Sequence, residues 1–219
     1  MTFPNAFNGV KKIFTAEILC LVGTLVLLVA GFLAAVSLVV AAGAPDQTGA
    51  VVTSLGMIAV ALIGSIVVVV GGILSLLGLI AAAKDQKYFQ YALYAVIVSI
   101  VFTAVSGSFS ANPALQSTLS ACGTAANLIS TIFVIQAIIE LAKTFNNTEL
   151  VEKGKSQLTL IVVIQVLSII ASIAVSFMGG QFASIVAAVI AIISVVLSLI
   201  QYILYLALLN RAKFMLETN

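Results

Sequence analysis

The residues that could do chemistry in this sequence are a few amides, carboxylates and hydroxyls embedded in long apolar stretches. Gln136, Gln165 and Gln201 each lie about seven or eight residues from the end of an apolar stretch at which basic residues appear. At a rise of about 1.5 Å per helical residue, the three amides share a depth of about 10–12 Å from one membrane surface. An amide without a hydrogen-bond partner in hydrocarbon costs several kcal/mol, so these side chains need polar neighbours.

Two interpretations of these polar side chains stay open. In the first, they line a pocket or vestibule open to the cytoplasm, and its eight candidate lining residues are Glu17, Asn127, Gln136, Glu140, Gln165, Ser172, Ser198 and Gln201. In the second, they make separate pair contacts between helices, and serine and threonine hydroxyls bond to carbonyls four residues back. The hydroxyl and small residues of the last four apolar stretches recur at helical spacing, so each stripe should face protein or water rather than lipid.

Several kinds of chemistry are excluded or disfavoured by residue types that the sequence lacks. There is no histidine, which excludes serine–histidine and cysteine–histidine catalysis. With two cysteines and few carboxylates inside the apolar stretches, an ordinary zinc or iron site is also disfavoured. The net charge of +2 comes without a basic domain, which argues against nucleic acid as a partner. We therefore expect a protein that is not an enzyme and that holds no cofactor or metal.

The elements that must position these side chains are membrane-spanning helices. The 219 residues are 63% hydrophobic and only 7% charged, whereas a soluble domain carries roughly 25% charged residues. The sequence predicts one all-α domain over residues 1–219. Its parts are an interfacial amphipathic segment at 1–12, a cytoplasmic loop at 143–157, and six spans at about 13–42, 50–83, 88–110, 114–142, 158–178 and 183–209.

The basic residues predict the orientation of these spans. Successive breaks between spans fall on opposite sides of the membrane, and the three breaks on one side carry no basic residue. All nine basic residues lie at the breaks and chain ends on the other side: Lys11, Lys12, Lys84, Lys87, Lys143, Lys153, Lys155, Arg211 and Lys213. The positive-inside rule then places both termini in the cytoplasm and arranges the spans as three antiparallel hairpins. The five tyrosines and the absence of tryptophan indicate a single aromatic belt, which we interpret as a multi-pass protein of a bacterial-type plasma membrane.

A seam of small residues marks the first two spans. In the second span Gly64, Gly71 and Gly78 fall seven residues apart, and Ser75 continues the same side of the helix. The first span has small residues at the same period, namely Gly23, Ala30 and Ser37. Small side chains let two helix backbones approach closely in lipid, so we expect these two spans to pack along their seams.

Two functions are compatible with these patterns. The first is a non-catalytic helix bundle that acts as an oligomerising or partner-binding membrane subunit, with a second copy or another membrane protein as its partner. The alternative is a passive channel, or a transport component that binds a lipid or a small neutral solute in a polar cavity. In topology, six spans with an inside amino terminus resemble the membrane-embedded subunits of bacterial vitamin importers.

Overall fold

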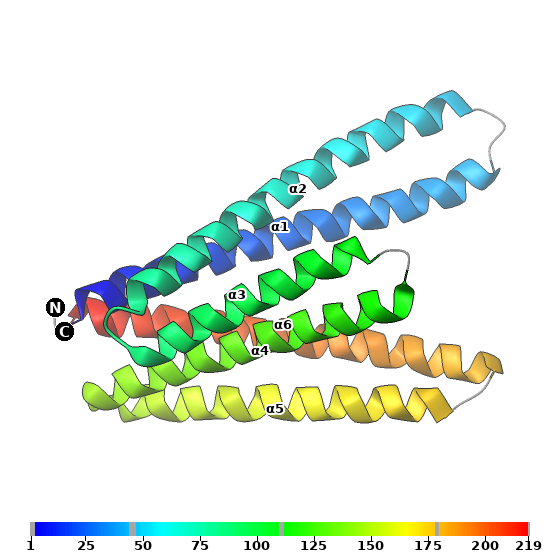
Figure 1. The fold of residues 1–219 in the computed structure, drawn as a ribbon. Helices are drawn as coiled ribbons and strands as arrows, with labels where there is room; N and C mark the ends of the chain where they lie inside the picture. The colour runs from blue at the N-terminus through cyan, green and yellow to red at the C-terminus, as the bar shows by residue number, and fades with distance from the viewer. Residues whose placement is uncertain (1–2, 44–46, 110–111, 178–179, 219) are drawn as a thin grey trace. The chain divides into compact units, whose positions relative to one another are not determined.

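The computed structural model of this chain describes residues 3–43, 47–109, 112–177 and 180–218 (Figure 1). Within the helices, only the backbone is described for 35, 37–43, 47–57, 113, 168–177, 180–188, 191 and 192. The six helices in chain order are α1 (Pro4–Gly43), α2 (Gln47–Ala82), α3 (Lys87–Ser108), α4 (Pro113–Thr144), α5 (Thr148–Phe177) and α6 (Gly180–Thr218). The described residues contain no strand.

The helices are of the membrane-spanning type that the sequence predicts. Over their described residues, five of the six are long and apolar enough to cross a bilayer. The exception is α5, whose predicted span at 158–178 lies in part outside the described residues. The all-helical, membrane-type fold is therefore confirmed, while the orientation of the termini stays a prediction.

The segment 143–157, predicted as a loop, is mostly helix. α4 continues to Thr144 and α5 already begins at Thr148. The side-chain oxygen of Asn147 accepts a hydrogen bond from the Leu150 N–H at 3.1 Å, which caps the first turn of α5. Asn146 adopts a φ of 52°, the left-handed conformation that asparagine tolerates at a helix end. Charged residues therefore extend α5 beyond its apolar stretch rather than interrupting it.

α1 likewise extends past the start predicted for the first span. It runs without a break from Pro4 to Gly43 and joins the interfacial segment at 1–12 to the apolar stretch at 13–42. Pro4 suits the first helical position because its missing N–H would have no partner within the helix. α4 begins in the same way at Pro113, and the Asn112 side chain accepts a hydrogen bond from the Leu115 N–H.

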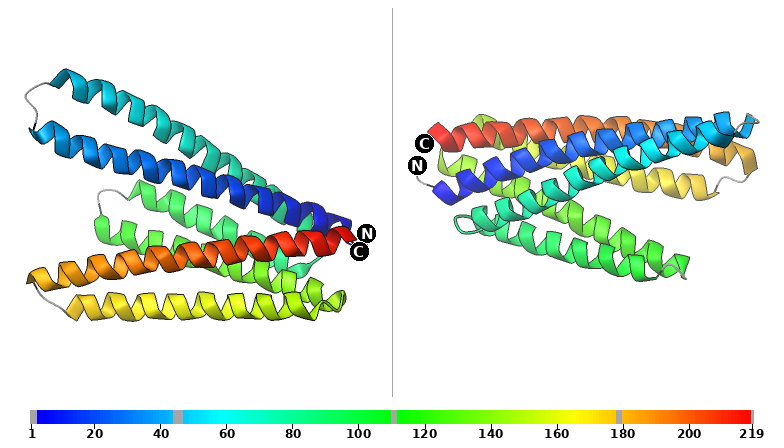
Figure 2. Two further views of the ribbon diagram at one scale, coloured as in Figure 1. Left: turned by 180° about the vertical axis from the view of Figure 1, so that it is seen from behind. Right: turned by 90° about the horizontal axis from the view of Figure 1, so that it is seen from above.

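The chain, predicted as one domain, divides into two compact units. The smaller unit comprises residues 11–78 and contains most of α1 and α2. The larger unit comprises residues 1–10 and 79–219. In the larger unit α3 packs on α4, α5 packs on α6, and α4 also contacts α5 and α6, which the views in Figure 2 illustrate.

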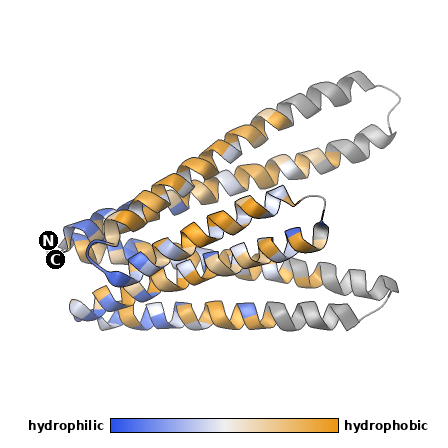
Figure 3. Cartoon of the chain, in the orientation of Figure 1, coloured by the Kyte–Doolittle hydropathy of each residue, from blue (hydrophilic) through white to orange (hydrophobic). Residues whose placement is uncertain are grey.

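The core of the larger unit lies toward the end that holds the α2–α3 and α4–α5 turns and most of the hydrophilic residues (Figure 3). Its largest fully buried side chains come from all six helices: Val10, Leu79, Phe89, Ile135, Ile138, Ile139, Ile161 and Leu209. At the same end the rings of Phe3 and Phe145 meet edge to face with their centroids 5.7 Å apart. This contact joins the beginning of α1 to the turn between α4 and α5.

Asp85 anchors the first turn of α1 to the turn between α2 and α3. One carboxylate oxygen of Asp85 accepts a hydrogen bond from the Ala6 N–H at 2.8 Å, and the other accepts one from Asn5 Nδ2 at 2.9 Å. The first N–H groups of a helix have no partner within the helix, and a carboxylate there also interacts favourably with the helix dipole. Asp85 thus caps a helix that begins about 80 residues earlier in the chain.

Candidate functional site

The smaller unit brings three of the predicted seam glycines into close contact between α1 and α2. A Cβ atom placed on Gly71 would lie 2.6 Å from Cys20 Sγ and 3.0 Å from the Ala16 carbonyl oxygen. A Cβ on Gly23 would lie 3.0 Å from the Gly64 carbonyl oxygen, and one on Gly64 would lie 3.2 Å from that of Gly23. The two backbones approach so closely that only glycine fits without a shift.

The other four seam residues differ in how deeply they are buried. Ala30 and Gly78 are buried, and Ser75 is half-buried. The side chain of Ser37 lies outside the described residues. The described close contacts between α1 and α2 therefore lie along Gly23, Gly64 and Gly71, from the middle of the hairpin toward the end opposite its connecting turn.

In the larger unit, hydroxyl groups join α3 to α4 by bonding to backbone carbonyls. Ser99 Oγ donates to the Gly123 carbonyl oxygen at 2.8 Å, and Ser130 Oγ donates to that of Ala92 at 3.0 Å. Among the described side chains, every buried nitrogen and oxygen atom has a hydrogen-bond partner. The described part of the α3–α4 contact is therefore a packed interface that contains satisfied polar groups.

Asn127 lies on the outside of this pair, near the middle of α4. It is exposed, and among the described residues nothing hydrogen-bonds to its side-chain amide. Ser120 and Thr124 are also exposed and lie on the same side of the helix, one to two turns away. The Thr124 hydroxyl is satisfied within its own helix, because it donates to the Ser120 carbonyl oxygen at 3.0 Å. The side-chain amide of Asn127 has no such bond among the described residues.

Two of the remaining vestibule candidates are linked along one edge of α4. Gln136 Nε2 donates to Glu140 Oε1 at 3.2 Å, and Lys143 Nζ makes an ion pair with the same oxygen at 2.8 Å. These contacts lie within one helix at spacings of three and four residues, so they require no cavity.

The other candidates do not join this group in the described structure. Gln165 and Ser198 are exposed, and Gln201 is half-buried. Glu17 is half-buried in the smaller unit, and the side chain of Ser172 lies outside the described residues. A vestibule lined by all eight residues stays a prediction.

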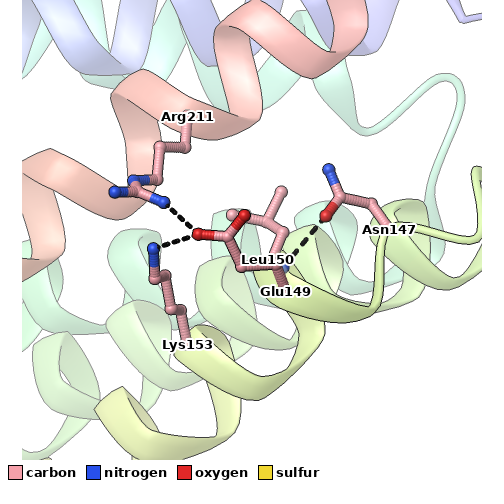
Figure 4. Close-up of polar contacts among 5 residues, drawn as sticks. All are labelled: Asn147, Glu149, Leu150, Lys153 and Arg211. Carbon is pink, nitrogen blue, oxygen red and sulfur yellow. Dashed lines mark hydrogen bonds and ion pairs between the residues drawn. The ribbon is translucent and has the colours of Figure 1, made fainter.

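A cluster of charges links α5 to α6 at the polar end of the larger unit (Figure 4). Arg211 Nη1 donates to Glu149 Oε1 at 2.6 Å, and Lys153 Nζ donates to the same oxygen. The hydrogen bond from Lys153, followed by that from Arg211, holds the pKa of the Glu149 carboxyl below its usual value of 4.5. Glu149 is fully exposed, so solvent and salt screen these attractions.

Two shallow grooves between α5 and α6 flank this cluster, and Arg211 borders both. The first has a volume of about 280 Å³ and is lined by Asn147, Glu149, Leu150, Arg211, Phe214, Met215 and Thr218. The second, which we call the α5–α6 groove, has a volume of about 210 Å³ and is lined by Lys153, Ser156, Gln157, Leu160, Leu204, Ala207, Leu208 and Arg211.

Gln157 is a buried polar residue that the sequence patterns did not single out. Only 4% of its surface is exposed, and its Nε2 donates to the Gln201 carbonyl oxygen across the α5–α6 contact at 2.9 Å. In the sequence it directly precedes the apolar stretch of α5, a place where a polar residue is typical of a loop or of the membrane surface. The four-residue spacing of Glu149 and Lys153 is a signal for helix that the sequence does contain.

No group of three or more histidine, cysteine, aspartate or glutamate side chains lies together as a metal site within the described part of the chain. No protein-family model, curated protein or solved structure matches the chain.

Proposed function

We propose that this protein is a non-catalytic, multi-pass membrane helix bundle that assembles through its helices with a second copy or with another membrane protein. Its helices form three antiparallel hairpins, and both termini lie in the cytoplasm of a cell with a bacterial-type plasma membrane. This orientation is supported by the basic residues, because all nine lie at the breaks and chain ends on one predicted side of the membrane. The two polar turns and the amino-terminal residues that gather at one end of the larger unit agree with it.

The observation that carries the assembly is the exposed amide of Asn127. α4 is 32 residues long, and Asn127 lies close to its midpoint, where a spanning helix meets the hydrocarbon core. An amide left against lipid tails costs several kcal/mol, whereas a hydrogen bond to another helix offsets that cost. Because no described residue of its own chain bonds to this amide, a second protein surface over this side of α4 supplies the partner.

The packing of α3 against α4 supports a bundle without a water path at that interface. The hydroxyls of Ser99 and Ser130 are used in bonds to carbonyls of the neighbouring helix. Thr103 Oγ1 donates to a carbonyl of its own helix, that of Ser99, at 2.9 Å. The hydroxyls of Ser99 and Ser130 thus hold the two helices together, and all three hydroxyls are already hydrogen-bonded and do not need water.

A passive channel or small-solute transport component is the second candidate. It is favoured by the continuity of the exposed polar side of α4, where Ser120, Thr124 and Asn127 follow one another at helical spacing. In a channel, water rather than a second protein would cover this side. The two proposals therefore differ in what touches Asn127.

Cysteine substitution at Asn127 separates these possibilities. The background is the Cys20→Ser, Cys122→Ser variant, and the matched control is Ile129→Cys, an exposed apolar position about 200° around the same helix. In native membranes an oxidant should cross-link Asn127→Cys chains into a species of twice the 22.6 kDa chain mass, and the control should stay monomeric. If a different membrane protein covers this side, a bifunctional thiol cross-linker joins it to Asn127→Cys alone.

Two results count against the proposed assembly. Rapid reaction of Asn127→Cys with a membrane-impermeant thiol reagent, without cross-linking, favours the channel. Equal cross-linking at both positions indicates random collision and removes the argument from Asn127.

A further inference from the structure

The α5–α6 groove changes from polar to apolar along its length. Lys153 and Arg211 line one part, and Leu160, Leu204 and Ala207 line another. The apolar stretch of α5 begins at residue 158 and that of α6 ends near residue 209. The groove therefore crosses the level at which both helices pass from hydrocarbon to headgroups, with its cations on the headgroup side.

The charge at this level is positive after the internal ion pairs are counted. Lys153 and Arg211 share a single carboxylate, that of Glu149, so the cluster keeps one net positive charge. A guanidinium carries five N–H donors in a planar fork that matches phosphate oxygens, and Glu149 engages one of its nitrogens. The buried Gln157 holds α5 against α6 beneath this cluster and keeps the two cations on facing helices.

We propose that the α5–α6 groove binds an anionic phospholipid of the cytoplasmic leaflet. The phosphate lies against Arg211 and Lys153, and one acyl chain follows Leu160, Leu204 and Ala207 into the hydrocarbon. A headgroup with a net negative charge complements the cluster, and the apolar half of the groove suits a chain rather than a soluble phosphate compound. The choice of leaflet rests on the proposed orientation, whereas the groove itself is formed by residues of α5 and α6 and does not involve Asn127, so failure of lipid binding and failure of the proposed assembly are distinguishable.

The test compares lipid retention by native mass spectrometry of the full chain purified in mild detergent. Phosphatidylglycerol and phosphatidylcholine with identical acyl chains are titrated separately. We expect the chain to bind phosphatidylglycerol more tightly, and the Lys153→Ala, Arg211→Ala double variant to lose about 30-fold in that affinity, about 2 kcal/mol for two cations. The matched control is the Lys84→Ala, Lys87→Ala double variant, which removes equal charge from the same predicted side and should stay within about twofold of the native chain.

A single substitution tests the same site in the opposite direction. Glu149→Gln removes the carboxylate that competes for both cations, so the affinity for phosphatidylglycerol should rise about fivefold. A misfolded chain would lose affinity for the lipid, so misfolding does not account for such a gain. The proposal is overturned if the two lipids bind alike, if both double variants lose affinity equally, or if Glu149→Gln weakens binding. Displacement of the lipid by millimolar inorganic phosphate also overturns it, because the site would then recognise phosphate alone.

Discussion

Replacing Gly71 by alanine should separate α1 from α2. The new Cβ would lie 2.6 Å from Cys20 Sγ and 3.0 Å from the Ala16 carbonyl oxygen, whereas ordinary contacts lie at 3.4–4 Å. The sulfur can move by rotation of its side chain, but the carbonyl belongs to the backbone of α1, so the helix itself must shift. Overpacking of this kind costs about 1–3 kcal/mol.

The neighbouring glycine provides a matched control. A Cβ on Gly72 would meet nothing within 4 Å. Gly72→Ala should therefore raise the free energy of unfolding by about 1 kcal/mol, because alanine has a higher helix propensity than glycine. Gly71→Ala has the same gain and adds the steric cost. The free energy of unfolding should therefore be lower for Gly71→Ala than for Gly72→Ala by about 1–3 kcal/mol, which corresponds to a gap of about 2–12 °C in apparent melting temperature.

Cys20 supplies the assay, because it lies at the contact itself. In the Cys122→Ser background, a thiol-reactive fluorophore reports the temperature at which Cys20 becomes accessible in mild detergent. Gly71→Ala should also label faster below the transition, since its helices are further apart. Equal melting temperatures for Gly71→Ala and Gly72→Ala, or a more stable Gly71→Ala, would refute the close approach of α1 and α2.

Three further predictions concern the larger unit. Asp85→Ala should lower the free energy of unfolding by about 1–2 kcal/mol because the first turn of α1 loses its cap, while Lys84→Ala, at an exposed neighbour, should change it little; equal effects would contradict the capping role. Gln157→Ala should cost about 0.5–1.5 kcal/mol in the same melting assay, and the exposed Ser156→Ala should be neutral. The stabilisation from Glu149 should be complete above pH 4.5 and lost as the pH falls through its lowered folded-state pKa, because protonation removes both ion pairs. The difference in melting temperature between the native chain and Glu149→Gln should therefore be largest above pH 4.5 and shrink as the pH falls below it, and a difference that does not change with pH would contradict the ion pairs.

Hydropathy alone was sufficient to predict the fold class. A helix that crosses about 30 Å of hydrocarbon needs about 20 apolar residues, so each span leaves a signal that is local in the sequence. The seven-residue period of Gly64 and Gly71 is also local, and it is along these residues that α2 meets Gly23 of α1. Hydropathy failed at 143–157, because it does not distinguish a loop from a charged extension of a helix.

The polar contacts depended on tertiary structure. Glu149 meets Arg211 across 62 residues, and Asp85 meets Ala6 across 79. Such pairs depend on how far each helix is rotated and shifted along its neighbour, which is set by the packing of many side chains rather than by any local pattern. The sequence by itself therefore determined that this chain forms long apolar helices with a glycine seam, and only the packing of those helices decided that Gln157 is buried, that Asn127 faces outward and that two cations share one groove.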